Sequence, residues 1–290
     1  MLRATILTTC TLLISACAVS IDHTDVFAVR DAHLPVSRLA LPETLPRGKI
    51  EEVAVEASDR VFYGYKISAR KPTRAVLFFS GNGYGASSAI GRIGEAFADE
   101  VTDVYVVSYA VPPESPPRVA QVYALAERLA QKAMEGGIPR QHVAAVGHSL
   151  GGWIALHLAT TPLVGCAVVA GTGTTAEQTA KRLLPDLVSA TLPLRLTEDV
   201  LLLNNIEQAR VSRVPVLVVA SERDKTMPVV ESRMIFEALP EWNRQLHISR
   251  TAAHNGYFRD AVVIDQMREF IRGSCGVATG NAARDAGVNV

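Results

Sequence analysis

Hydrophobic positions change their spacing several times along the chain, and these changes mark the elements that we expect. Alternating apolar and polar residues, rich in valine and tyrosine, predict an antiparallel hairpin over 50–57 and 60–67. Further on, short continuous apolar runs alternate with stretches of helical spacing. The runs predict buried strands at 75–79, 104–107, 143–146, 164–170, 215–220 and 245–248. The helical spacing predicts helices at 88–97, 119–134, 153–159, 229–239 and 261–271.

Strands that alternate with helices predict an α/β fold, with a mainly parallel central sheet flanked by helices. We expect residues 47–272 to form this domain. Residues 172–213 are too many for a simple connection, so they predict a small helical cap inserted into it. The leucines of the cap either roof an apolar pocket or pack on the helices beneath, and the sequence leaves both open.

The two ends of the chain lack this alternation of strand and helix patterns. Residues 1–16 combine one early arginine with a short apolar stretch, which predicts an export signal peptide. The stretch ends in Ile14-Ser15-Ala16-Cys17, which resembles a bacterial lipobox, so we expect lipidation of Cys17 and a lipid anchor in the bacterial cell envelope. Ordinary cleavage nearby and a retained segment are the alternatives. Residues 17–46 predict a tether, and 273–290 a disordered tail.

Composition narrows the classes of function. The 290 residues are 48% hydrophobic and 20% charged, with a formal net charge of zero, and zero charge argues against a nucleic-acid partner. The cysteines at 10, 17, 166 and 275 lack metal-ligand spacing, so we expect no metal and no other cofactor. We expect Cys166 and Cys275 to be buried free thiols, with a bridge between them as the alternative.

The candidate chemistry begins at Gly147-His148-Ser149-Leu150-Gly151-Gly152, directly after a predicted strand. A G-x-S-x-G motif between a strand and a helix exposes the serine on a strained turn, where side chains at the glycines would collide. The start of the helix can also stabilise negative charge. Ser149 is therefore the candidate nucleophile, and a tight turn that merely needs glycine is the alternative.

A neutral serine needs a general base. His254 is the candidate, because it follows the last predicted strand in a loop. His157 lies inside a buried helix and His247 inside a strand, which makes both less suitable. His148 is adjacent to the serine on a sharp turn, so its side chain should diverge.

The base needs an orienting acid. Asp224 follows the strand at 215–220 and lies four residues before Pro228, which favours it. Glu222 is the competitor, and a purely helix-capping role for Asp224 is the alternative.

A tetrahedral intermediate needs hydrogen-bond donors. The loop Ser80-Gly81-Asn82-Gly83-Tyr84-Gly85 follows a predicted strand, and its glycines allow close approach of the backbone. We expect the N–H of Asn82, or less favourably Gly83, to form an oxyanion hole with that of Leu150. A phosphate cradle is the rival interpretation, but no Walker lysine follows.

Together these motifs resemble those of α/β-hydrolase-fold enzymes of the serine aminopeptidase-like and Bem46-like groups, over about residues 50–272. In those families a histidine usually opens the first motif, where Ser80 stands here, which removes a loop-bracing side chain. Bem46-like proteins also tend to have a Tyr-Arg-Gly-Tyr-Gly turn, where this chain has Tyr109-Ala-Val-Pro-Pro113. We therefore expect a remodelled substrate pocket.

The residues predict a serine hydrolase that cleaves a carboxylic ester or related small-molecule acyl substrate through an acyl-enzyme. A peptidase or aminopeptidase-like enzyme is one alternative, with an acidic cluster in the cap from Glu177, Asp186, Glu198 and Asp199. A non-catalytic envelope binding protein on the same fold is the other.

Overall fold

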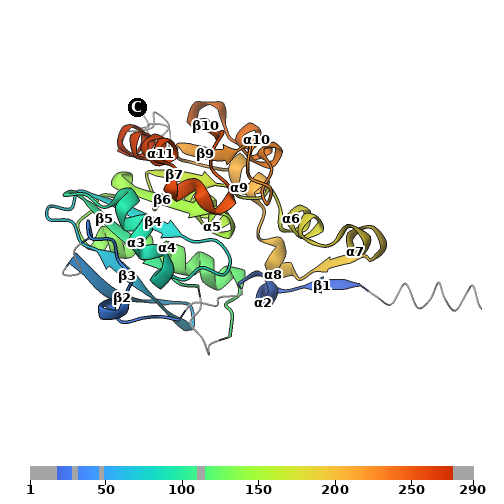
Figure 1. Cartoon of the computed structure of the whole chain (residues 1–290), viewed down its shortest axis with the longest axis horizontal. Helices are drawn as coiled ribbons and strands as arrows, with labels where there is room; N and C mark the ends of the chain where they lie inside the picture. The colour runs from blue at the N-terminus through green and yellow to red at the C-terminus, as the bar shows by residue number, and fades with distance from the viewer. Residues whose placement is uncertain (1–17, 28–31, 46–48, 110–114, 277–290) are drawn as a thin grey trace, which may run out of the picture.

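An eight-stranded sheet lies at the centre of the protein, in the order β10-β9-β7-β6-β4-β5-β3-β2 (Figure 1). The computed structural model describes residues 18–27, 32–45, 49–109 and 115–276. β3 runs antiparallel to β2 and β5, and the other neighbours in this sheet are parallel. The strands are β2 (Ile50–Ala57), β3 (Arg60–Ile67), β4 (Arg74–Phe79), β5 (Thr102–Val107), β6 (Val143–His148), β7 (Cys166–Ala170), β9 (Val216–Ser221) and β10 (Arg244–Ser249). The prediction of a mainly parallel sheet with an antiparallel hairpin is confirmed.

Helices cover both faces of the sheet, so its central strands contribute to two hydrophobic cores. One core lies under α4 (Val119–Glu135), α5 (Leu150–Ala159), α9 (Asn205–Arg210) and α10 (Val229–Ala238). The other lies under α3 (Ala86–Phe97) and α11 (Ala261–Ser274). Along β4, Leu77 and Phe79 enter the first core and Val76 and Phe78 the second, because successive strand side chains point to opposite faces.

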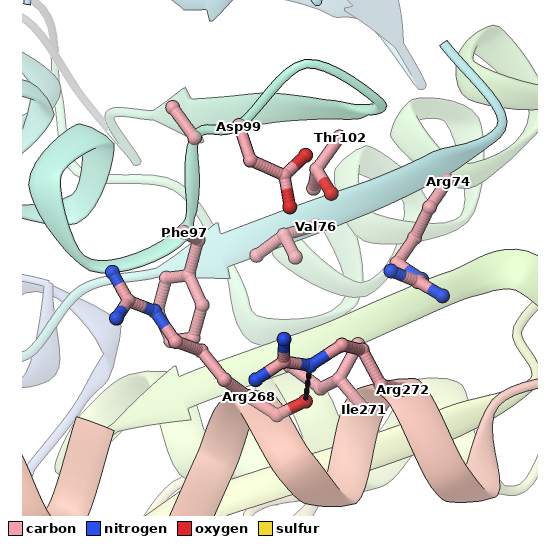
Figure 2. Close-up of a pocket in the computed structure, with 9 residues that line it drawn as sticks. Arg74, Val76, Phe97, Asp99, Thr102, Arg268, Ile271 and Arg272 are labelled. Carbon is pink, nitrogen blue, oxygen red and sulfur yellow. Dashed lines mark hydrogen bonds between the residues drawn. The ribbon is translucent and has the colours of Figure 1, made fainter. Parts of the chain in front are cut away.

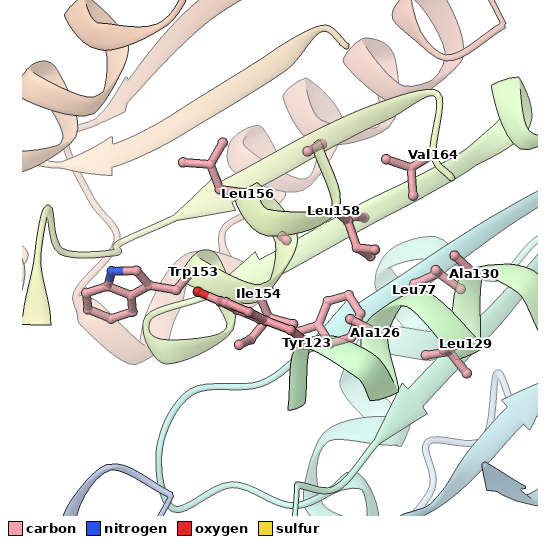
Figure 3. Packing of buried hydrophobic residues seen from close by; sticks show 14 of the residues in the cluster. Leu77, Tyr123, Ala126, Leu129, Ala130, Trp153, Ile154, Leu156, Leu158 and Val164 are labelled. Atoms are coloured by element: carbon pink, nitrogen blue, oxygen red, sulfur yellow. The ribbon is translucent and has the colours of Figure 1, made fainter. Parts of the chain in front are cut away.

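The first core shows why α5 is apolar on nearly every side. α5 packs on the sheet beside α4 and α9. Figure 3 shows Ile154 and Leu158 of α5 close to Tyr123 of α4. His157 is the exception within α5. Its ring stacks on Tyr123, with ring centroids 3.9 Å apart, and its Nε2 lies 2.8 Å from a carboxylate oxygen of Glu127. His157 is therefore a partnered structural histidine.

The N-terminal segment packs on the domain, which differs from the tether that the sequence predicted over 17–46. β1 (Val19–Ile21) pairs in parallel with β8 (Leu194–Leu196), and α2 (His23–Val26) follows. Phe27 is fully buried, and further along Leu39 and Leu45 enter the second core. Isolated apolar residues between prolines give no periodic signal, so sequence pattern could not reveal these long-range contacts.

The cap consists of α6 (Ala176–Leu183), α7 (Asp186–Thr191), β8 and α8 (Glu198–Leu201). In Figure 1 these elements lie beside β1 and α2, on one side of the sheet. The cap predicted over 172–213 includes the residues of α9, but α9 packs in the first core instead. The cap thus ends earlier than predicted and includes a strand contact with the N-terminal segment.

A disulfide joins Cys166 at the start of β7 to Cys275 just after α11. The expectation of two free thiols is contradicted, and the bridge that the sequence left as the alternative is present. α11 also extends past the predicted start of the tail at 273, because its last turn packs back on the sheet and buries Cys275. The predictions for residues 1–16, for Cys17 and for the tail from residue 277 concern residues outside the described part of the chain.

The disulfide should stabilise the fold strongly, because it closes a loop with a sequence separation of 109 residues. We expect the double variant Cys166→Ala/Cys275→Ala to lose about 2–5 kcal/mol of unfolding free energy in a urea titration. Dithiothreitol should lower the unfolding free energy of the wild type by a similar amount, and with it the urea midpoint. It should leave the double variant unaffected. Equal midpoints for wild type with and without dithiothreitol would contradict this.

Candidate active site

Ser149 lies on a strained turn between β6 and α5. Its backbone has φ 52° and ψ −117°, and Ser58 is the other described non-glycine residue with positive φ. The turn is fixed on both sides, because the N–H of Ser149 donates to the carbonyl of Ala170 and its own carbonyl accepts from Gly152, both at 2.9 Å. Backbone strain of this kind persists where the surrounding structure enforces it, often at functional sites.

The glycines of the motif allow three backbone segments to meet. A Cβ on Gly147 would lie 2.1 Å from the carbonyl oxygen of Gly151. A Cβ on Gly151 would lie 1.9 Å from the carbonyl oxygen of Phe79, at the end of β4. Neither position has room for a side chain, so the motif requires glycine at both for steric reasons.

The structure brings Ser149, His254 and Asp224 together at the carboxyl edge of the sheet. His254 opens a short 3₁₀ helix (His254–Arg259) after β10, and Asp224 lies in the loop after β9. His254 Nε2 lies 3.1 Å from Ser149 Oγ, and His254 Nδ1 lies 2.8 Å from Asp224 Oδ2. The carboxylate accepts from Nδ1–H, so the lone pair of Nε2 faces the serine hydroxyl.

Asp224 is buried and its carboxylate is fully hydrogen-bonded. Oδ1 accepts from the backbone N–H groups of Thr226 (2.9 Å) and Met227 (2.8 Å), and Oδ2 accepts from His254 and from the Tyr257 hydroxyl (2.9 Å). Burial by itself raises the pKa of this carboxyl. The hydrogen bonds, led by the one from His254, outweigh burial and hold the pKa below its usual value. The group is therefore an anion at neutral pH, whereas the competitor Glu222 is exposed.

Tyr257 is a site residue that sequence reasoning missed. Its side chain is fully buried, and burial together with the charge of Asp224 raises its pKa, so the hydroxyl remains a donor. Gly171, with φ +53°, makes room for it at the end of β7, because a Cβ there would lie 2.6 Å from the tyrosine ring. The available signal was its spacing of three residues from His254, which places both on one face of a helical turn.

His148 supports the loop that carries His254. Its Nε2–H donates to the backbone carbonyl of His254 at 2.8 Å. Burial, with a smaller contribution from the neighbouring His254, lowers the pKa of His148 to about 4, so the ring is neutral at pH 7. His148 therefore supports the backbone of His254 and is not placed as the base. His247, the other histidine considered, lies within β10.

Two hydroxyl groups hold the loop after β4 in place. The Ser80 hydroxyl donates to the carbonyl of Tyr84 at 2.5 Å, and the buried Tyr109 hydroxyl donates to the carbonyl of Ser80 at 2.8 Å. Leu150 is the first residue of α5, so its N–H has no acceptor within the helix. Asn82 and Leu150 line the same cavity as Ser149.

This cavity, about 230 Å³ in volume, lies between the sheet edge, the cap and the N-terminal segment. Its lining is mostly apolar and includes Trp153, Leu183, Leu184, Val200, Leu203, Met227 and, from the N-terminal segment, Ile21 and Val26. Some cap leucines therefore line a pocket, although Leu183 is also 60% exposed. Leu187, Leu201 and Leu202 are exposed and lie outside this lining. Within the described part of the chain, no group of three or more histidine, cysteine or acidic residues is placed to hold a metal ion.

Comparison with known proteins supports the architecture. No protein-family model matches the chain, and no curated protein matches it in sequence. Solved structures do match. The Pyrococcus furiosus esterase Pf2001 has a TM-score of 0.64 and 14% identity over 86% of this chain and 100% of its own.

Two further matches have different activities in their names. A 2,6-dihydroxy-pseudo-oxynicotine hydrolase has a TM-score of 0.64 and 13% identity, over 80% of this chain and 69% of its own. A Pyrococcus horikoshii acylaminoacyl peptidase has a TM-score of 0.60 and 13% identity, over 80% of this chain but only 43% of its own. The chain therefore has the α/β-hydrolase fold, and at this identity the likeness extends to the fold alone.

The packing at the serine turn predicts that Gly151 tolerates no side chain. We expect Gly151→Ala to lower the unfolding free energy by about 3 kcal/mol or more, or to prevent soluble expression, because the new methyl group overlaps the Phe79 carbonyl. Gly273→Ala is the matched control in α11, where a Cβ meets no atom within 4 Å. It should leave stability unchanged or raise it by up to about 1 kcal/mol in the same urea titration. Equal stability of the two variants would contradict the packing argument.

Proposed function

We propose that this protein is a serine hydrolase that acts on carboxylic esters or related acyl substrates. One observation carries the proposal: the chain of hydrogen bonds from the Ser149 hydroxyl through His254 to the buried Asp224 carboxylate, at the edge of an apolar cavity. The three groups have the order and geometry that acyl transfer needs.

In the proposed reaction, Ser149 Oγ attacks the acyl carbon while His254 Nε2 takes its proton. Asp224 holds the imidazole in the required tautomer and stabilises its cation, and Tyr257 keeps that carboxylate ionised and oriented. The N–H groups of Leu150 and Asn82 stabilise the oxyanion. His254 then protonates the departing alcohol, and water hydrolyses the acyl-enzyme by the same steps in reverse.

The cavity favours an acyl ester over a peptide with a free amino terminus. Among its lining residues Asp25 is the one charged side chain, and its carboxylate accepts from the N–H of Asp22. Two acidic cap residues also have other partners: Glu177 pairs with Lys181, and Asp199 accepts from the N–H of Val119 at the start of α4. An aminopeptidase would need carboxylates at the pocket to bind the substrate ammonium group, and Asp25 is the one acidic side chain in a lining that is otherwise mostly apolar.

The proposal includes export and a lipid anchor at Cys17. The disulfide supports export, because such bonds persist in oxidising compartments outside the bacterial cytoplasm. β1 begins two residues after Cys17 and pairs with a strand of the cap. An anchor at Cys17 would therefore hold the cap and the cavity beneath it close to the membrane surface.

The proposed triad predicts how three variants behave with a fluorophosphonate probe and a p-nitrophenyl ester. Ser149→Ala should abolish labelling, and Ser149→Ala and His254→Ala should each lower kcat by about 10³-fold or more. Asp224→Asn should lower it strongly as well, because the amide no longer favours the required tautomer. His247→Ala is the matched control, since this histidine lies within β10, and it should retain wild-type turnover.

Equal labelling of Ser149→Ala and wild type would exclude Ser149 as the nucleophile. An unlabelled wild type would instead favour a non-catalytic binding protein on the same fold. Faster turnover of aminoacyl anilides than of esters would favour the peptidase alternative.

Anchoring at Cys17 predicts that Cys17→Ala moves the protein from the membrane pellet to the soluble fraction of a bacterial lysate, as followed by immunoblot. Cys10→Ala is the matched control within the same leader and should remain in the pellet. Retention of Cys17→Ala in the pellet after a high-salt wash would count against lipidation at this residue.

A further inference from the structure

A second cavity, about 320 Å³ in volume, lies next to the proposed active site. Gly81 and His148 form part of its wall, together with Asn255, the residue after His254. Phe78 and Phe258 also line it. The loop after β4 therefore borders both cavities, because Asn82 lines the first one with Ser149 whereas Ser80 and Tyr84 line the second.

Two arginines, Arg92 from α3 and Arg259 at the end of the 3₁₀ helix, line this second cavity. They come from two elements that are in contact, α3 and the 3₁₀ helix. Burial lowers the pKa of Arg92, and the positive charge of Arg259 lowers it further. No acidic residue is among the lining residues, and neither arginine has an ion pair among the described residues.

Two carboxylates close in sequence to these arginines have hydrogen-bond partners of their own. Glu95, one turn along α3, attracts Arg92 but lies outside the lining and accepts a hydrogen bond from Thr44. Asp260 follows Arg259 in sequence, yet its carboxylate caps α11 and accepts from Ser249 and Thr251. The cavity is thus lined by two arginines and by no acidic residue.

We propose that this cavity binds an oxyanion, a carboxylate or a phosphate group, on the leaving-group side of the substrate. The inference rests on the proposed function. The apolar cavity takes the acyl chain, so the alcohol portion lies on the other side of Ser149 and His254, toward Asn255 and Arg259. When the ester bond breaks, the departing oxygen takes the proton from His254 Nε2, and the anionic group stays with the arginines until the product leaves.

A different arginine-rich cavity provides a control. Figure 2 shows Arg74, Arg268 and Arg272 around a cavity that also contains Asp99. Arg74 opens β4, so this cavity lies at the opposite end of that strand from the proposed active site. Arg272 is exposed there and its Nε donates to the carbonyl of Arg268. Replacing Arg272 removes one positive charge far from Ser149.

The test compares two substrates that differ in one charge: phenyl butyrate and the butyrate ester of 4-hydroxybenzoate, at pH 7.5. The readout is the ratio of kcat/KM for the carboxylated ester to that for the neutral one. We expect Arg92→Ala and Arg259→Ala each to lower this ratio about tenfold, because a guanidinium–carboxylate hydrogen bond is lost. Arg272→Ala should leave the ratio within about twofold of wild type. An unchanged ratio in both cavity variants, or an equal fall in Arg272→Ala, overturns the inference.

A binding measurement separates this inference from the proposed function. Calorimetry on Ser149→Ala titrates 4-hydroxybenzoate and, in a second arm, inorganic phosphate, which tells a carboxylate site from a phosphate site. Binding that Arg92→Ala abolishes in this background supports the anion site even if the wild type hydrolyses neither ester. Binding to neither anion, or equal binding with and without Arg92, overturns it.

Discussion

The close approach of the first turn of α5 to the ends of β4 and β6 is the constraint on which the site depends. The glycines at 147 and 151 let backbone touch backbone, and Ser149, midway between them, adopts a positive φ. The cost of that conformation, on the order of 1–3 kcal/mol, is offset by burial of the strands and helix on either side. Because the turn cannot relax, the serine hydroxyl stands at a fixed point above the sheet edge, and the first helical N–H groups surround it.

The partners of the serine come from neighbouring strands for the same topological reason. β6, β7, β9 and β10 are adjacent and parallel, so their carboxyl ends and the loops after them meet on one edge. Each loop is then fixed by its own hydrogen bonds: Tyr257 and two backbone amides hold Asp224, and His148 holds the backbone of His254. The buried carboxylate stays charged because every lone-pair direction is satisfied.

The pocket is assembled differently from the rest of the site. Its floor belongs to the sheet edge, but its roof combines the cap with a segment that precedes the domain in sequence. Pairing of β1 with β8 joins these two parts. If the lipid anchor proposed at Cys17 is present, the same strand pair links the membrane to the roof of the cavity, which would bring apolar acyl substrates directly to the pocket.

The sequence by itself determined the strand–helix order, the elbow at Ser149, and the loops that hold Asp224 and His254, because hydrophobic period and glycine spacing are local properties of the chain. Other features were decided only by the tertiary structure. Nothing in the sequence distinguishes Tyr257 from other aromatic residues, and its role depends on the space that Gly171 leaves for it beside Asp224. Cys166 and Cys275 meet only because α11 packs back on β7. Phe27, Leu39 and Leu45 belong to no periodic pattern, since elements distant in sequence bury them. Arg92 and Arg259 likewise line one cavity only because α3 and the 3₁₀ helix come into contact in the folded chain.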